Sequence, residues 1–102
     1  MATYVIGEVE VTKPEALTGY GALIARAVEK FGGKYLAHGA KPYVLEGGPA
    51  HNMLIIEFAN VDIALSWYNS PEYAAAKAMR EGASNLRLVV VDDKLKSPPI
   101  EK

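Results

Sequence analysis

The sequence predicts an α+β fold in which strands and helices follow one another in the order β-α-β-β-α-β. Three observations support this prediction. Runs rich in β-branched, alternating residues are separated by two stretches with apolar residues at helical spacing. Glycine or proline stands at most of the boundaries. At 102 residues the chain has the size of one domain. This order is that of the ferredoxin-like sandwich, an antiparallel four-stranded sheet with two helices on one face.

The first strand and helix are expected in the first third of the chain. Residues 3–11 alternate and are rich in valine and isoleucine, which is typical of a strand. Pro14-Glu15 suits the first turn of a helix, and apolar residues then recur at helical spacing as far as Phe31. Gly32-Gly33 is expected to end this helix, because glycine adopts the left-handed conformation without steric cost.

A hairpin is expected to follow the first helix. The second strand is predicted over residues 34–38, and it stays open whether this strand continues past Gly39 through residues 42–45. Gly47-Gly48-Pro49 is typical of a turn. Residues 52–58 have the clearest strand pattern of the chain.

The second helical stretch is expected to consist of two pieces that meet at an angle. Asn60 is a suitable cap for a helix over residues 61–69. Ser70-Pro71 starts a second piece, which ends before Gly82. The last strand is predicted over residues 86–91. The domain is therefore expected to span residues 1–93, followed by an extended or mobile tail over residues 94–102.

The composition excludes several classes of protein. The formal net charge is −1 and no basic stripe exists that could neutralise phosphates, so we expect no nucleic-acid binding. The apolar runs are too short to span a bilayer, and no basic segment followed by an apolar one opens the chain, so we expect neither a membrane span nor a signal peptide. The chain has no cysteine, which excludes disulfides and thiol catalysis. A cytoplasmic location is the expectation.

The alternation within the strands predicts a homodimer. With both helices on one face, the other face of the sheet should be polar unless something covers it. The side chains expected there are largely apolar, and two such faces packed about a two-fold axis would remove them from water. The apolar residues of this face are Tyr4, Ile6, Met53, Ile55, Val89 and Val91.

The same face carries charged residues that are candidates for a site. Glu8, Glu57 and Arg87 belong to it. His38 joins them if it points the same way as Leu36. Because an imidazole beside a carboxylate can move a proton at neutral pH, we regard Glu57, His38 and Glu8 as candidate catalytic residues. Ion pairing of Arg87 with either glutamate, at the edge of the sheet or across the dimer, explains the same charges structurally, and both interpretations stay open.

Arg80 is the first candidate for ligand binding. Tyr73 and Arg80 lie seven residues apart, on one flank of the apolar stripe of the second helix. At the border of the buried face, the guanidinium could hold a carboxylate or enolate oxygen by two hydrogen bonds. The structural alternative pairs Arg80 with Glu57, with Glu8 or with the neighbourhood of Glu81, and this pairing seals the helix onto the sheet.

Three other aromatic residues could line a pocket or belong to packing alone. Adjacent helical positions point about 100° apart, so Trp67 and Tyr68 cannot both face the core. Tyr68 continues the apolar stripe and is expected in the core. Trp67 is expected to one side, where it lines a pocket, packs on the dimer partner or covers the helix join. The same alternatives hold for Tyr20.

Metal, haem and phosphate sites are not expected, and we predict no cofactor. His38 and His51, with scattered acids, form no recognised metal pattern. Gly32-Gly33 and Gly47-Gly48 lack the strand and helix context of a phosphate-binding loop. A haem or metal protein stays as a third hypothesis, which would be coloured or contain metal when purified.

Several short strings occur in a fixed order over nearly the whole chain, from about residue 3 to residue 91. They are Tyr4-Val5-Ile6, Phe31-Gly32-Gly33-Lys34-Tyr35-Leu36, Glu46-Gly47-Gly48, Ile56-Glu57-Phe58, Trp67-Tyr68-Asn69-Ser70-Pro71-Glu72-Tyr73 and Arg80. Together they resemble the DUF1330 family of small proteins of unknown function. The resemblance implies a ferredoxin-like fold that dimerises into an α+β barrel, and it implies no activity. Family members often carry an arginine where this chain has Ala37-His38.

Two hypotheses of function follow from these residues. The first is a small-molecule-binding protein or cofactor-independent enzyme of the dimeric α+β barrel type, which acts on a small oxyanion- or carbonyl-bearing compound. In this hypothesis Glu57, Glu8 or His38 moves a proton and Arg80 binds the anionic oxygen, while Tyr73, Trp67 and Tyr20 shape the walls. The alternative is a non-enzymatic dimeric structural or interaction module in which the same charges are structural.

Overall fold

Strand β1, Thr3–Val11, lies in the middle of the sheet and pairs with an antiparallel neighbour on each side. The computed structural model describes residues 2–92. The neighbours of β1 are β3, Asn52–Phe58, and β4, Ser84–Val91. β2, Lys34–Ala40, pairs with the far edge of β3, so the strand order is β2-β3-β1-β4. The predicted antiparallel four-stranded sheet is confirmed.

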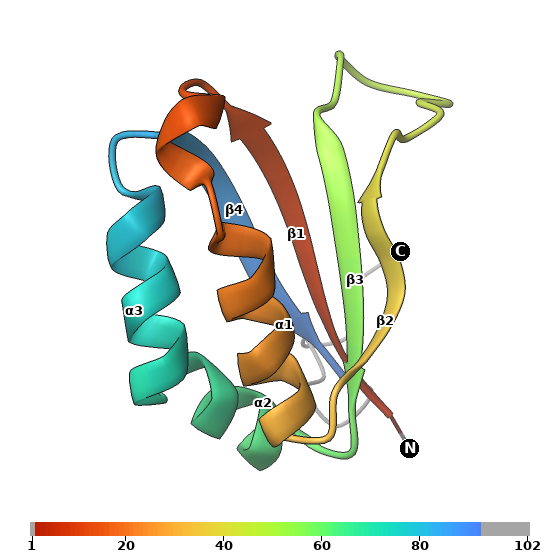
Figure 1. The fold of residues 1–102 in the computed structure, drawn as a ribbon. Helices are drawn as coiled ribbons and strands as arrows, with labels where there is room; N and C mark the ends of the chain where they lie inside the picture. Colours follow the sequence, from red (N-terminus) through yellow and green to blue (C-terminus); the bar gives the residue numbers. More distant parts are fainter. Residues whose placement is uncertain (1, 93–102) are drawn as a thin grey trace, which may run out of the picture.

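The helices all cover one face of this sheet (Figure 1). They are α1, Tyr20–Lys30, α2, Val61–Tyr68, and α3, Pro71–Arg80. The predicted joint between the last two is present, because the Ser70 hydroxyl accepts a hydrogen bond from the Tyr73 amide at 3.1 Å and donates one to the Trp67 carbonyl at 2.7 Å. The α+β class and the ferredoxin-like arrangement are therefore confirmed.

Two elements differ from their predicted extents. The first helix is interrupted: residues Pro14–Leu17 form a 3₁₀ turn, η1, and α1 begins only after Gly19. Gly19 has a φ of 82°, a left-handed conformation that breaks helical continuity and that glycine adopts at low cost. β2 continues past Gly39 and ends at Ala40, so residues 42–45 do not extend the strand.

The core lies between the sheet and the helices. Trp67 is 2% exposed, and its ring packs against Phe58 at 5.3 Å and Tyr73 at 4.7 Å between centroids. Tyr68 is 37% exposed, so the expectation that Tyr68 fills the core and Trp67 lies to one side is wrong. The buried stripe of α2 passes through Ala64 and Trp67, three residues apart, which rotates Tyr68 toward the surface.

No helix or loop of residues 2–92 covers the second face of the sheet, called the bare face below. Leu36, Val89 and Val91 are 50%, 37% and 47% exposed there. Within residues 2–92, no helix is both long enough and apolar enough to cross a membrane. The predicted tail over residues 94–102 lies outside the described residues.

Loss of the Ser70 hydroxyl is expected to destabilise the protein. Ser70 is 4% exposed and bonds both helix pieces, so Ser70→Ala should lower the free energy of unfolding by about 1 kcal/mol or more, the usual effect of losing a helix cap. Urea unfolding measures this change. Ser66→Ala, at an exposed position of α2, is the control and should unfold like the wild type. Equal stability of the Ser70 variant would contradict the capping role.

Candidate functional site

Arg80 occupies the last turn of α3 and is half-buried. Two helical turns separate it from Tyr73, which places both side chains on one flank. An Nη2–H group of Arg80 donates to the Tyr73 hydroxyl across 3.4 Å. The Arg80 Nε atom is buried and has no hydrogen-bond partner among residues 2–92. The guanidinium is therefore fixed by a hydrogen bond at Nη2, whereas its Nε–H group lacks an acceptor in the described part of the chain.

The positive charge of Arg80 is not balanced by a carboxylate in the described part of the chain. The ion pairs found there join Lys30 to Glu72 and His51 to Glu10. Glu8 and Glu57, the partners expected by the structural alternative, lie on the opposite face of the sheet from Arg80. The predicted pairing of Arg80 with either glutamate is therefore not formed.

Tyr20, the first residue of α1, meets the same guanidinium. Burial raises the pKa of the Tyr20 phenol and the neighbouring Tyr73 raises it further, while the charge and hydrogen bonding of Arg80 oppose these effects. The Tyr20 phenol consequently keeps its proton at neutral pH. Arg80 thus lies among hydroxyl groups instead of carboxylates.

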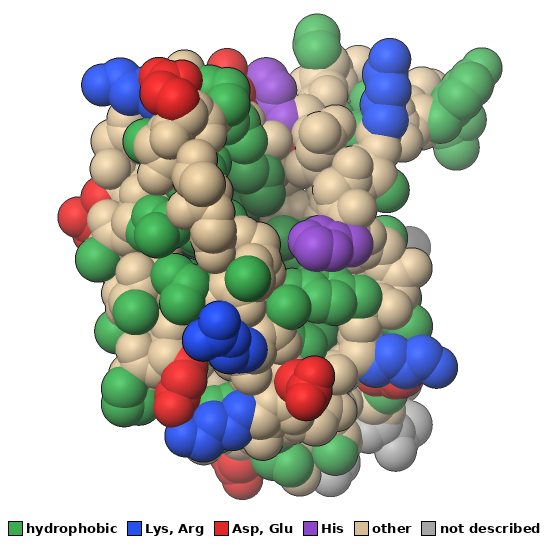
Figure 2. Space-filling view, viewed as in Figure 1, with side chains coloured by type: hydrophobic (Ala, Val, Ile, Leu, Met, Phe, Trp, Pro, Cys, Tyr) green, Lys and Arg blue, Asp and Glu red, His purple; other side chains and the backbone are tan. Residues whose placement is uncertain are grey.

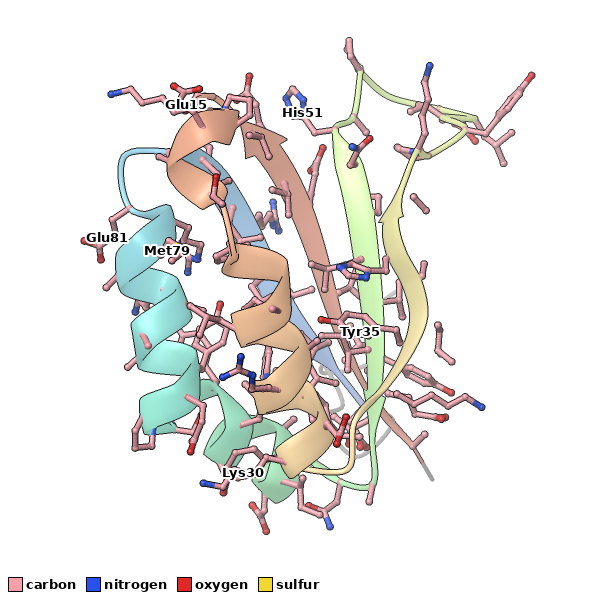
Figure 3. The ribbon with its side chains drawn as sticks, in the orientation of Figure 1. Glu15, Lys30, Tyr35, His51, Met79 and Glu81 are labelled. Atoms are coloured by element: carbon pink, nitrogen blue, oxygen red, sulfur yellow. The ribbon has the colours of Figure 1, made fainter. Side chains whose placement is uncertain are left out.

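Tyr35 adds another buried hydroxyl next to this group. Burial raises the pKa of Tyr35 to about 12, and Tyr20 contributes to the increase. The Tyr35 hydroxyl has no hydrogen-bond partner among the described residues. The ring stacks on His38 with 4.3 Å between centroids, and Figure 3 shows Tyr35 between α1 and β2.

Two adjoining cavities lie between the helices and the sheet. The larger, of about 380 Å³, is bounded by α2, α3, β1 and β4, and Arg80 lines it. The smaller, of about 70 Å³, is lined by Tyr20, Tyr73 and His38. Trp67 and two leucines of β4 line both, so they form the wall between them. The site residues on helices therefore surround one divided space.

The smaller cavity continues outward into a third, more open one. This outer cavity has a volume of about 620 Å³ and is bordered by the β2–β3 loop and the end of β1. Tyr20 and His38 line both it and the smaller cavity, so they stand at the mouth. On this side of the molecule, hydrophobic side chains reach the surface between α1 and β2 beside a histidine (Figure 2).

The structure brings together only part of the predicted site. Arg80, Tyr73, Trp67 and Tyr20 line the adjoining cavities, and His38 lies at the mouth. This arrangement groups every predicted ligand-binding residue with one predicted catalytic residue.

Glu8 and Glu57 are not part of this group. Glu57 flanks the buried Ile56 in β3 and therefore points to the bare face of the sheet, as does Glu8 in β1. In the register, Glu57 is opposite Tyr4 whereas Glu8 is opposite Arg87, so the glutamates lie toward different ends of the sheet. The expected cluster of both carboxylates with His38 is not formed.

A change of register in β2 explains the position of His38. The pairing of β2 with β3 shifts between Tyr35 and Ala37 and again before Ala40. Such an irregularity breaks simple alternation, so Tyr35 and His38, three residues apart, stack on one side.

The expected ion pair between Glu8 and Arg87 is also not formed within residues 2–92. The Glu8 carboxylate instead accepts a hydrogen bond from the His51 amide at 2.8 Å. His51 is labelled in Figure 3 and lies at one end of the sheet.

Tyr35, which lies beside the site and stacks on His38, is the residue that sequence reasoning missed. It belongs to one of the strings that carry the family resemblance, and this was its only signal. Its buried, unpartnered hydroxyl results from packing against α1 and from the irregular register of β2, neither of which local sequence reports.

Comparison with known proteins identifies a family and a fold. Residues 2–94 match the family described as Domain of unknown function (DUF1330). No curated protein sequence matches the chain. A structure of a protein of unknown function from Rhodopseudomonas palustris has a TM-score of 0.72 and 22% identity, covering 95% of this chain and 84% of that chain.

Two further structures are more distant in sequence. A dimeric ferredoxin-like protein of unknown function from Jannaschia sp. CCS1 has a TM-score of 0.71 and 9% identity, covering 90% of this chain and 99% of that one. SnoaB, a cofactor-independent oxygenase from Streptomyces nogalater, has a TM-score of 0.55 and 10% identity, covering 96% and 98%. At these identities the likeness shows the fold alone.

The raised pKa of Tyr35 predicts a loss of stability at high pH. In the unfolded chain this phenol ionises near its ordinary pKa of 10, whereas in the folded protein it ionises at about 12. The stabilisation is therefore complete below pH 10 and is lost as the pH rises through about 12. Urea unfolding between pH 9 and about 12 should show a steeper loss for the wild type than for Tyr35→Phe. Tyr43→Phe, at a 90% exposed position, should follow the wild type, and identical slopes in all three proteins would refute the assignment.

Proposed function

The chain belongs to the DUF1330 family, and from that premise we propose that it binds a small, partly apolar compound bearing an oxyanion or a carbonyl. The observation that carries the proposal is Arg80, a half-buried cation at a cavity with no carboxylate partner in the described part of the chain. Removing a charge from water is costly unless it is paired. A bound oxyanion would supply the missing partner.

The surrounding groups suit an acceptor ligand. The Tyr20 hydroxyl keeps its proton at neutral pH and can donate a hydrogen bond in the smaller cavity, which Tyr20 lines. Donors directed at a developing oxyanion are also what a cofactor-independent enzyme requires. A cofactor-independent oxygenase shares the fold, which supports the enzyme hypothesis by analogy alone.

Proton transfer in such an enzyme is best supported for His38. It lies at the mouth of the smaller cavity, beside Tyr35. Glu57 and Glu8 lose support as catalytic residues of this site, because both point to the other face of the sheet. Of the three predicted catalytic residues, His38 alone lies on the same side of the sheet as Arg80. It lines the smaller cavity and Arg80 the larger one, so a ligand that meets both must extend past Trp67.

The proposed assembly is a homodimer through the bare face of the sheet. Exposed apolar residues of that face, among them Leu36 and Val91, would be removed from water by a second copy. Structures of the same fold include dimeric proteins, which agrees with this proposal.

The alternative function is a non-enzymatic interaction module. The observation that favours it is the β2–β3 loop, where Tyr43 and Leu45 are 90% and 87% exposed. In that case Arg80 would serve stability alone. The two hypotheses differ in whether small compounds bind.

A screen of small organic acids, ketones and aromatic compounds by thermal shift is expected to give hits. Binding to the folded state alone raises the melting temperature. The hits should lose their effect in Arg80→Ala and keep it in Arg26→Ala, which removes the same charge from an exposed position of α1. Hits that stabilise both variants as well as the wild type would place the site elsewhere, and a screen without hits would favour the interaction module.

The proposed dimer is expected to depend on the bare face. Light scattering after size exclusion should give twice the mass of one chain for the wild type. Ile55→Asp would place an unpaired charge in the interface and should give a monomer. Ala25→Asp, at an exposed position of α1, is the control and should remain dimeric. A monomeric wild type would refute the assembly.

A further inference from the structure

We propose that the ligand of the Arg80 site is a monocarboxylate with a compact apolar body, and that Trp67 donates the second hydrogen bond to its carboxylate. This inference rests on the proposed function and narrows it to one class of compound. The charge, the donors and the walls of the cavity of about 380 Å³ each restrict what can bind there.

The charge of this cavity matches a single negative charge. Among residues 2–92, Arg80 is the one lining residue that carries a formal charge, and no acidic side chain of this part of the chain lines the cavity. A singly charged anion would neutralise the guanidinium. A dianion such as phosphate would leave excess negative charge against largely aliphatic walls, which is unfavourable in a medium of low dielectric constant.

Two residues that line this cavity carry a buried N–H group without an acceptor among residues 2–92. The Trp67 side chain is 2% exposed, yet its indole Nε1 has no hydrogen-bond partner among residues 2–92, and the same holds for Arg80 Nε. Buried indole N–H groups normally find a partner, and a buried donor without one is destabilising. Both residues line the same cavity, and the proposal places one ligand group against both donors once the side chains that bury them have adjusted.

A carboxylate fits these two donors better than a carbonyl. It has two oxygens, one for Arg80 Nε and one for Trp67 Nε1, and it also carries the charge that Arg80 lacks. A ketone or amide offers one oxygen and no charge. The carboxylate is thus the simple group that satisfies both N–H groups and the cation together.

The guanidinium is held ready for this role. Its Nη2 group donates to the Tyr73 hydroxyl, and the Tyr20 hydroxyl lies close enough for the guanidinium to act on the pKa of that phenol. These contacts leave Nε as the unsatisfied donor of the side chain. A donor that is already oriented loses little conformational entropy when it binds.

The walls determine the rest of the ligand. Apart from Arg80 and two aromatic residues, the lining consists of valine, leucine and alanine side chains, and the volume is near the lower end of the roughly 300–1,000 Å³ typical of small-molecule sites. The ligand body is therefore a short branched chain or a single ring without a second charge.

The chain contains one tryptophan, which makes the test direct. The indole N–H of Trp67 gives a single resonance in a ¹⁵N-labelled sample of the full chain. Titration with 4-methylpentanoate is expected to bind and to move the indole proton downfield. The matched neutral amide, 4-methylpentanamide, should bind about tenfold more weakly or worse, because it lacks the charge-assisted bond. Succinate and inorganic phosphate should also bind more weakly.

The role of Arg80 is tested in the same titration. Arg80→Met keeps the aliphatic stem and should weaken 4-methylpentanoate about tenfold or more, with a much smaller effect on the amide. Arg26→Met removes a charge from an exposed position of α1 and should bind like the wild type. The dispersion of the amide spectrum shows whether each variant is folded.

The outcomes separate this inference from the proposed function. If neutral carbonyl compounds bind as tightly as the carboxylate and still require Arg80, the carboxylate class is wrong while the proposed function stands. If the carboxylate binds without moving the indole resonance, the role of Trp67 is wrong. If no acid, ketone or aromatic compound binds at Arg80 in the titration or in the thermal screen, both the inference and the proposed function fail.

Discussion

The aromatic contact of Phe58, Trp67 and Tyr73 is the interaction on which the rest of the structure depends. It joins the last residue of β3 to α2 and α3 and is buried at its centre. The Ser70 joint fixes the angle between the two helices, so Tyr73 is held where its hydroxyl meets Arg80. The same residue, Tyr73, therefore packs in the core and orients the guanidinium of Arg80. A change at the aromatic contact would alter the divided cavity as well as stability.

The sheet separates two kinds of surface with different consequences. On the helix side, a cation and several hydroxyls surround cavities with apolar walls. On the bare side, Glu8 and Glu57 accompany exposed apolar residues. Because these acids lie across the sheet from Arg80, no carboxylate of residues 2–92 pairs with the guanidinium. This separation favours a ligand site over a structural ion pair, and it leaves the bare side for association with a second copy.

Local sequence determined most of the fold, and tertiary context determined the parts that were missed. The Ser70-Pro71 joint and the strand over residues 52–58 were predictable, because caps, proline and alternation act over a few residues. The burial of Trp67 in place of Tyr68 was not predictable from local sequence. Either residue would continue an apolar stripe, and the packing of Trp67 against Phe58 decides between them. His38 was misplaced because the irregular register of β2 cannot be seen in one strand alone.

The central claim is that the buried N–H groups of Arg80 and Trp67 bind one acceptor group of a ligand. A crystal structure of the protein as purified, or soaked with a small monocarboxylate, tests it most directly. The account predicts non-protein density within hydrogen-bonding distance of Arg80 Nε and Trp67 Nε1, enclosed by the cavity beneath α2 and α3. A guanidinium paired with a carboxylate of this chain or of its dimer partner, beside an empty cavity, would contradict it.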